Sequence, residues 1–191
     1  MDIKIALGII GGVLIAGSFI PYIHDIVKAK TEPHVYTWFI WSITHLIAAL
    51  AILEGNGGLF AAFSVASGGI LSFTIFLMSL RHGTRNITTF DTATLIIAIL
   101  AVLVWWKLDH PEWAIIIVAF IDILGFLPTV RKTWIDPHSE STIAWTLYAF
   151  GNIAALLAIT SYSIMTSFYI VAMIVASTSL VIAIVLRKRL F

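Results

Sequence analysis

Apolar residues along this chain form long continuous runs, separated by short segments in which glycine, proline and charged residues gather. The run from Leu95 to Trp106 contains no polar side chain. A helix needs about 20 apolar residues to cross the hydrocarbon core of a bilayer. Strands of an outer-membrane barrel would instead alternate apolar and polar residues over about 10 positions. The pattern therefore predicts an all-α integral membrane protein.

The polar breaks divide the chain into seven predicted spans. They lie near residues 4–27, 35–53, 59–80, 91–106, 113–130, 142–161 and 165–186. A polar loop is expected at 131–141, and Asp91 is expected in the first turn of the fourth helix, where its charge suits the helix dipole. Seven spans use most of the 191 residues. We therefore expect a single membrane domain over 1–191, with no second folded domain.

Composition excludes several classes of protein. Only 11% of the residues are charged and 60% are hydrophobic, with a mean hydropathy of +1.03, whereas soluble domains are about 25% charged. A net charge of +1 and the lack of a long basic tract indicate no nucleic-acid partner. The chain has no cysteine, which excludes disulfides and thiolate metal sites. We expect neither a cofactor nor a metal.

The basic residues predict the orientation of the chain in the membrane. With seven spans, the N-terminal side would hold Lys4 and Lys107. The opposite side would hold the other nine, Lys28, Lys30, Arg81, Arg85, Arg131, Lys132, Arg187, Lys188 and Arg189. Basic residues favour the cytoplasmic side. We therefore expect an outside N-terminus, a cytoplasmic C-terminus, and a multi-pass location in the plasma (inner) membrane.

An internal repeat emerges when the chain is compared with itself at a shift of 107 residues. The matched residues include Phe19 with Phe126, Pro21 with Pro128, Trp38 with Trp145, and four apolar pairs between 48–52 and 155–159. The third and seventh spans share only Ser72 with Ser179 and Ile75 with Ile182. Spans one to three (4–80) thus correspond to spans five to seven (113–186) in the same orientation, and an unpaired linker helix (91–107) joins them.

This three-one-three arrangement, with a proline near the cytoplasmic end of each first helix and a short basic loop after it, resembles the PQ-loop and SWEET (MtN3-like) transporter superfamily. It is similar to a divergent bacterial-type member. Tyr22 and Thr129 stand where the glutamine of the PQ motif follows the proline, and the seventh helix lacks the asparagine of the sugar carriers. The resemblance implies a pocket between the two triplets, opened alternately to each side, with Pro21 and Pro128 as hinges.

Three polar side chains are predicted near the middle of the membrane. Asp122 is central in the fifth span, His45 in the second and its repeat partner Asn152 in the sixth. An ionisable group at this depth costs about 2.5–3.5 kcal/mol on insertion scales, so a functional role is expected. Asp122 could carry a coupling proton, pair with a cationic substrate or with His45, or serve as a structural hydrogen bonder.

Large aromatic residues share a helix face with these polar groups, because they are three or four residues apart. The two matching sets are Trp38, Trp41 and His45, and Trp145, Tyr148 and Asn152. An aromatic wall beside a polar centre suits a small amphipathic solute. The alternative is that these aromatics pack between helices or join an interface belt. Gly125 and Thr129, with Ser18 and Tyr22 opposite, could line the same path.

The sequence therefore favours a small-solute carrier that works by alternating access, with Asp122 and His45 as candidate proton-coupling groups and lipid around it. A receptor or sorting protein of the same fold, binding a peptide or protein partner, is the main alternative. A purely structural membrane protein is a further one. No His-Glu-x-x-His or Gly-x-Ser-x-Gly motif occurs, so we expect no enzyme. A monomer would suffice, and the sequence leaves an oligomer open.

Overall fold

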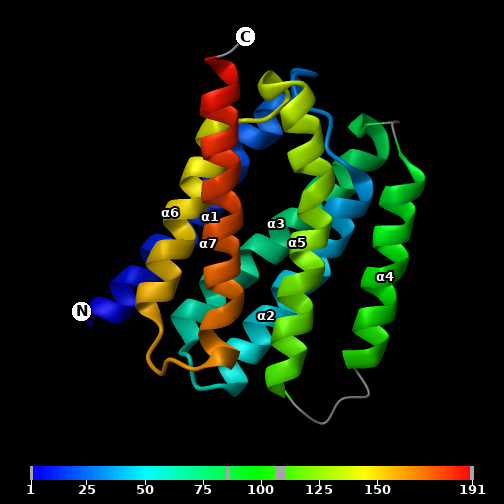
Figure 1. Cartoon of the computed structure of the whole chain (residues 1–191). Coiled ribbons are helices and arrows are strands. Elements are labelled where there is room, and N and C mark those ends of the chain that lie inside the picture. Colours follow the sequence, from blue (N-terminus) through cyan, green and yellow to red (C-terminus); the bar gives the residue numbers. More distant parts are fainter. Residues whose placement is uncertain (1, 85–86, 106–110, 190–191) are drawn as a thin grey trace.

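The computed structural model describes residues 2–84, 87–105 and 111–189, and all regular structure in these ranges is helical (Figure 1). The elements are α1 (Ile3–Val27), α2 (Val35–Glu54), α3 (Leu59–His82), α4 (Thr89–Trp105), α5 (Pro111–Ile135), the short 3-10 helix η1 (Pro137–Ser139), α6 (Thr142–Ala158) and α7 (Ile164–Lys188). The expected all-α class is confirmed.

Four of these helices, α1, α2, α3 and α7, are long and apolar enough to cross a membrane. Helix α6 is apolar but has 17 residues. Large apolar side chains cover the outside of the bundle, among them Ile20, Leu50 and Phe63, which are 57–71% exposed. An exterior of this kind would be unfavourable in water. The fold is consistent with an integral membrane protein.

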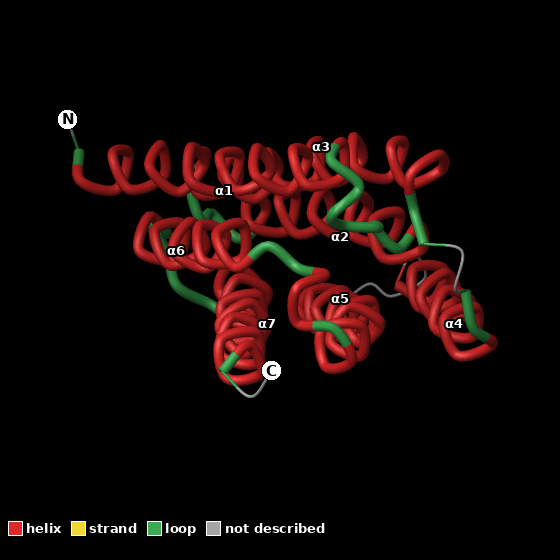
Figure 2. The backbone as a smooth tube through the Cα atoms, turned by 90° about the horizontal axis from the view of Figure 1, so that it is seen from above, coloured by secondary structure: helices red, strands yellow, loops and turns green. Residues whose placement is uncertain are grey.

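The helices form two sets of three, which we call the first triplet (α1–α3) and the second triplet (α5–α7). In each set the third helix lies between the other two: α3 contacts α1 and α2, and α7 contacts α5 and α6. Within the described residues, the backbones of α1 and α2 do not come close to each other, and neither do those of α5 and α6, although aromatic side chains meet across both pairs. The sets meet where α1 packs on α6 and α2 on α5, while α4 lies at the edge against α5 and α2 (Figure 2).

Buried positions recur at fixed intervals in the two triplets. Each of the eight buried residues of α1 lies 107 positions before a buried residue of α5. The buried residues of α6 likewise follow buried residues of α2 by 107 positions. All seven buried residues of α7 follow buried residues of α3, but by 105 positions. The same faces of corresponding helices are therefore turned inward.

The interval of 105 corrects the predicted alignment of the third and seventh helices. Ser72 is buried, whereas Ser179, its expected match, is exposed. Ser177, two residues earlier, is buried like Ser72. The physical reason is that the second triplet has two fewer residues between the starts of its last two helices. Helix α6 begins 107 residues after α2, but α7 begins 105 residues after α3.

Two helix ends also differ from the expectation. Helix α5 continues to Ile135, so Arg131 and Lys132 lie in its last turns and the expected loop at 131–141 is shorter. Both side chains find acidic partners there, Asp91 and Glu140. Helix α6 ends at Ala158, where the Lys4 ammonium bonds the carbonyl oxygens of Leu157 and Ile159, each at 2.8 Å.

Both predicted hinge prolines lie inside helices rather than at their ends. Helix α1 runs through Pro21 to Val27. Helix α5 runs through Pro128 to Ile135 at the level of the backbone, and the side chain of Pro128 lies outside the described part of the structure. Neither proline therefore marks the end of its helix, and their role as hinges stays a prediction.

Small residues allow the triplets to meet closely. A Cβ atom added to Gly151 in α6 would lie 2.9 Å from the backbone nitrogen of Ile15 and 3.1 Å from the carbonyl oxygen of Gly11, both in α1. Helix α3 also bonds the backbone of α1, because the Ser64 hydroxyl donates to the carbonyl oxygen of Gly8 at 2.6 Å. Close backbone approach of this type holds helices together in lipid.

We predict that Gly151→Ala destabilises the protein by about 1–3 kcal/mol, because the new methyl group meets backbone atoms that cannot yield cheaply. Gly17→Ala is the matched control: its Cβ would meet nothing within 4 Å, and alanine favours a helix by up to about 1 kcal/mol. Thermal unfolding in detergent micelles measures both. A Gly151→Ala midpoint at or above that of the parent would contradict this packing.

Candidate functional site

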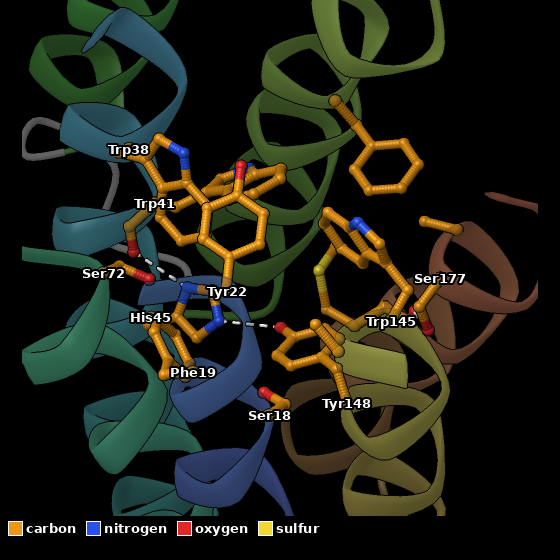
Figure 3. Close-up of a pocket in the computed structure, with 14 residues that line it drawn as sticks. Ser18, Phe19, Tyr22, Trp38, Trp41, His45, Ser72, Trp145, Tyr148 and Ser177 are labelled. Carbon is orange, nitrogen blue, oxygen red and sulfur yellow. Dashed lines mark hydrogen bonds between the residues drawn. The ribbon is translucent and has the colours of Figure 1, made fainter. Parts of the chain in front are cut away.

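A small cavity of about 40 Å³ lies between the two triplets (Figure 3). Its lining residues come from six helices, and none of the described side chains of α4 is among them. The lining residues of the first triplet are Ser18, Phe19, Tyr22, Trp38, Trp41, His45 and Ser72, and those of the second are Phe126, Ala144, Trp145, Tyr148, Met173, Ala176 and Ser177. Each triplet thus contributes seven residues to one cavity.

The aromatic residues predicted from helix spacing meet at this cavity. The ring centroids of Trp38 and Trp41 are 5.1 Å apart, those of Trp41 and Trp145 5.9 Å, and those of Trp145 and Tyr148 6.0 Å. Most pairs are edge-to-face, a favourable arrangement for aromatic rings. The aromatics therefore pack on one another and form the cavity wall at the same time.

Sequence reasoning missed Phe19 and Phe126 as lining residues. Both pack in the aromatic cluster, at 5.9 Å from Trp38 and 5.3 Å from Trp145 respectively. The signal was available, because the two phenylalanines match each other in the repeat. Ser72 and Ser177 were also missed as a pair, since their correct alignment requires the interval of 105.

Asp122 is fully buried but does not line the cavity. Its Oδ2 accepts a hydrogen bond from the Tyr169 hydroxyl of α7 at 2.6 Å, and its Oδ1 accepts one from the Thr44 hydroxyl of α2. The carboxyl group thus ties together three helices of two triplets. Sequence reasoning missed both partners.

Thr44 belongs to a stripe of hydrogen-bonding residues along α2 that the spacing in the sequence could have predicted. Thr37, Trp41 and Thr44 are spaced by four and three residues, so they share a face. Thr37 donates to the carbonyl oxygen of Gly125 at 3.0 Å, and the Trp41 indole donates to the carbonyl oxygen of Asp122 at 3.3 Å. Every member of the stripe therefore bonds α5.

His45 connects the buried carboxyl group with the cavity. Its Nδ1 is 2.8 Å from the carbonyl oxygen of Trp41 and 4.0 Å from Oδ2 of Asp122. Its Nε2 is 2.8 Å from the Tyr148 hydroxyl, which lines the cavity. The 4.0 Å separation is too long for a hydrogen bond. The predicted His–Asp pair is thus adjacent without being directly bonded.

Asn152 is less close to the other polar groups than its depth suggested. Its side chain is buried and donates to the carbonyl oxygen of Tyr148 at 2.9 Å, one turn earlier in α6. It is not among the residues that line the cavity. A role for Asn152 in binding a substrate stays a prediction. Its connection to the cavity is its bond to Tyr148, which is a lining residue.

A second, larger cavity of about 350 Å³ lies at the basic end of the bundle. Charged side chains line it, including Lys30, Arg131, Lys132, Glu32 and Glu140. Of the residues proposed for a path, Thr129 lines this cavity, Ser18 lines the inner one, and Tyr22 lines both. We call it the vestibule.

Glu140 joins the vestibule to the inner cavity. One carboxylate oxygen, Oε1, is 2.7 Å from the Lys132 ammonium, and the other, Oε2, accepts from the Trp145 indole at 2.9 Å. Trp145 itself lines the inner cavity. The wall between the two cavities is therefore held by an ion pair and a charge-assisted hydrogen bond, which is a strong type of contact.

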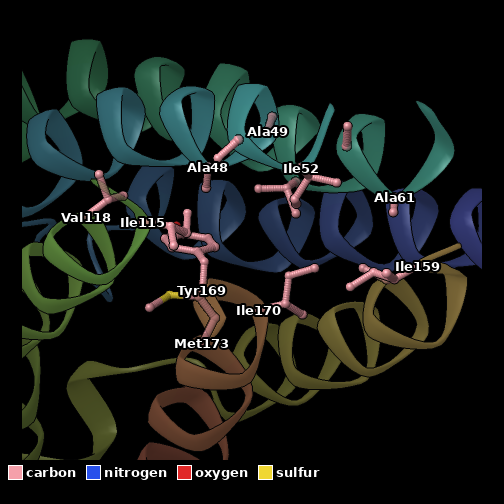
Figure 4. Close-up of a cluster of buried hydrophobic side chains, with 14 of the residues drawn as sticks. Ala48, Ala49, Ile52, Ala61, Ile115, Val118, Ile159, Tyr169, Ile170 and Met173 are labelled. Carbon is pink, nitrogen blue, oxygen red and sulfur yellow. The ribbon is translucent and has the colours of Figure 1, made fainter. Parts of the chain in front are cut away.

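At the opposite end, apolar packing fills the space between the triplets (Figure 4). Ala48 and Ile52 of α2, Ile159 after α6, and Ile170 of α7 are all fully buried in one cluster. Close-packed side chains of this kind leave no room for a polar solute. The cavity therefore lies between an apolar cluster on one side and an aromatic and charged wall on the other.

Asp91 lies in the first turn of α4, as expected, and anchors this helix at the basic end. Its Oδ2 accepts from the backbone nitrogen and hydroxyl of Thr88, at 2.7 and 2.8 Å. The same oxygen is 3.3 Å from Nε2 of His34 and 3.7 Å from Arg131. Burial is the main reason why the pKa of His34 is lowered, while the Asp91 carboxylate acts in the opposite direction.

No family model, curated protein or solved structure matches this chain.

We predict that His34 makes the fold sensitive to acid. Because its pKa is lower in the folded than in the unfolded chain, the unfolded chain binds more protons below the usual histidine pKa of about 6.5, and stability is lost as the pH falls through that value. In His34→Gln the unfolding midpoint should therefore fall less between pH 8 and pH 5 than in the parent, by about 2–4 °C for each kcal/mol involved.

His138→Gln is the control, since the side chain of His138 is 68% exposed. The measurement is the unfolding midpoint in detergent micelles across this pH range. Parallel curves for His34→Gln and the parent would show that His34 does not contribute.

Proposed function

We propose that this chain is a small-solute transporter that works by alternating access, with seven transmembrane helices arranged as two parallel triplets joined by α4. The observation that carries the proposal is the cavity between the triplets, to which each triplet contributes seven lining residues. The recurrence of buried positions at 107 and 105 residues supports the repeat. The resemblance to the PQ-loop and SWEET superfamily points the same way.

The proposal also covers the membrane. Helices α4 and α6 have 17 residues each, which gives about 25 Å at 1.5 Å per residue and is at the lower limit for a span. The nine basic residues on one side favour a cytoplasmic C-terminus and insertion in the plasma (inner) membrane. Contacts among all six triplet helices within one chain support a carrier that is complete as a monomer.

Barriers on both sides of the cavity support alternating access. The apolar cluster closes the outer end, and the Trp145–Glu140–Lys132 connection closes the vestibule side. Transport would require each barrier to open in turn. Pro21 and Pro128 are the proposed hinges, because a proline inside a helix removes one backbone hydrogen bond and permits bending.

Asp122 and His45 are the proposed proton-coupling groups. Asp122 is held by two hydroxyl groups with no basic side chain bonded to it among the described residues. His45 reaches from its vicinity to Tyr148 on the cavity wall. A proton gained or lost at this cluster would change hydrogen bonds at the cavity and also between α2, α5 and α7. Such a group can link occupancy of the cavity to helix movement.

A receptor or sorting protein is the second candidate, and the vestibule favours it. Its volume of about 350 Å³ and its lining of lysine, arginine and acidic side chains would suit a charged peptide terminus. A receptor would bind such a peptide without moving any solute. The experiment on Asp122 separates the two functions.

We predict that Asp122→Asn abolishes the stimulation of uptake by a pH gradient. A solute screen in proteoliposomes, with and without the gradient, first identifies a transported solute for the parent. Asparagine keeps the size of the side chain and one of the two acceptor oxygens, but it cannot exchange a proton. Asp25→Asn is the matched control, because Asp25 lies near the cytoplasmic end of α1, where its side chain is 3.3 Å from the exposed ring of His24.

Two results would count against the proposal. Transport by Asp122→Asn with unchanged dependence on the gradient would exclude proton coupling at this residue. Failure of the parent to move any solute, together with tight binding of a charged peptide, would favour the receptor.

A further inference from the structure

Among the described residues, two of the three serines that line the inner cavity direct their hydroxyl hydrogens away from it. Ser18 donates to the carbonyl oxygen of Ile15, and Ser177 donates to the carbonyl oxygen of Met173, both at 2.6 Å. A hydroxyl has one hydrogen and two lone pairs. With the hydrogen used inside the helix, each serine offers the cavity only an acceptor.

The Tyr148 hydroxyl also offers the cavity only an acceptor, because its hydrogen is directed to His45. The carbonyl oxygen of Trp41 can only accept, so Nδ1 of His45 carries the hydrogen of that 2.8 Å bond. In the neutral ring the other nitrogen, Nε2, is then an acceptor. The Tyr148 hydroxyl, 2.8 Å away, must donate to it. The oxygen of Tyr148 therefore also presents only lone pairs to the cavity.

The indole N–H groups of two lining tryptophans also donate to partners outside the cavity. Trp41 donates to the carbonyl oxygen of Asp122, and Trp145 donates to the carboxylate of Glu140. These rings present carbon atoms and electron-rich faces to their surroundings. Tyr22 and Ser72 are the lining hydroxyls outside this arrangement.

The groups that face the cavity favour the same sign of charge. No lysine or arginine is among the described residues that line it. Two acidic groups lie behind the wall: Oδ2 of Asp122 is 4.0 Å from Nδ1 of His45, and Glu140, which pairs with Lys132, accepts from the Trp145 indole. Hydroxyl lone pairs, aromatic faces and a carboxyl group behind them all favour a positively charged guest. Aromatic faces attract ammonium groups by cation–π interaction, which becomes stronger when water is excluded.

The size of the cavity limits what it can hold. A water molecule needs roughly 10–15 Å³ on the same measure, so about 40 Å³ accommodates a group of a few non-hydrogen atoms. A methylammonium-sized head group fits this space, whereas a large polar solute does not.

We propose that the inner cavity binds the ammonium head group of a small organic amine, with Ser18, Tyr148 and Ser177 accepting its N–H hydrogens and the tryptophan faces surrounding its charge. This names a substrate class for the proposed transporter and rests on that function. It makes Tyr148 and Ser177 specificity-determining residues, and His45 a positioning residue that fixes the direction of the Tyr148 hydrogen.

The test is equilibrium dialysis of radiolabelled methylammonium against the purified full chain in detergent. Unlabelled methylammonium should displace the label. Methanol, which has the same number of non-hydrogen atoms but no charge, should not. Tetramethylammonium, which has the charge but no N–H group, should compete more weakly than methylammonium.

Tyr148→Phe should raise the Kd for methylammonium about tenfold, because a hydrogen bond to a charged group is lost. Ser177→Ala should act in the same direction and leaves the aromatic packing intact, so it serves if Tyr148→Phe folds poorly. Tyr162→Phe is the matched control, since Tyr162 is 57% exposed and does not line the cavity.

Equal competition by methanol, or an unchanged Kd in both Tyr148→Phe and Ser177→Ala, would overturn the inference. Its failure can be told from failure of the transporter proposal. Methylammonium binding that behaves as expected, without flux of any solute in proteoliposomes, would support the inference and overturn transport. Flux of neutral solutes without methylammonium binding would support transport and overturn the inference.

Discussion

The need to satisfy one buried carboxyl group governs how the helices of this protein meet. A bundle with an apolar exterior offers no water to a polar side chain in its centre, so every such group must find partners inside. Asp122 finds Thr44 on α2 and Tyr169 on α7. These bonds fix how α2, α5 and α7 are rotated, and the rotation of α2 in turn brings Trp41 and His45 to the cavity.

Much of this arrangement could be predicted from the sequence because the signals are local or repeated. Continuous apolar runs gave the helices, and the spacing of Trp38, Trp41 and His45 gave the face that lines the cavity. The partners of Asp122 could not be predicted with equal ease. Tyr169 lies 47 residues away, and only the mutual rotation of α5 and α7 decides that the two side chains meet.

Features that depend on contacts between residues far apart in the sequence were not predicted correctly. Arg131 and Lys132 were predicted to lie in a loop, because charged residues usually mark a helix end. Asp91 and Glu140 pair with them, and α5 continues past both residues. The seventh helix was aligned two residues out of step, since identical serines occur at both 177 and 179. Burial separates the two serines, and burial is a property of the packed bundle.

The two barriers around the cavity differ in their chemistry, and this has a consequence for the resting state of a carrier. Dissolved ions screen a partly exposed pair such as Lys132 and Glu140, whereas salts such as sulfate strengthen apolar packing. Ionic strength therefore weakens the barrier on the vestibule side and leaves the apolar cluster at the other end intact or tighter. In the proposed carrier, the salt concentration of the surroundings would bias which side of the membrane the empty cavity faces.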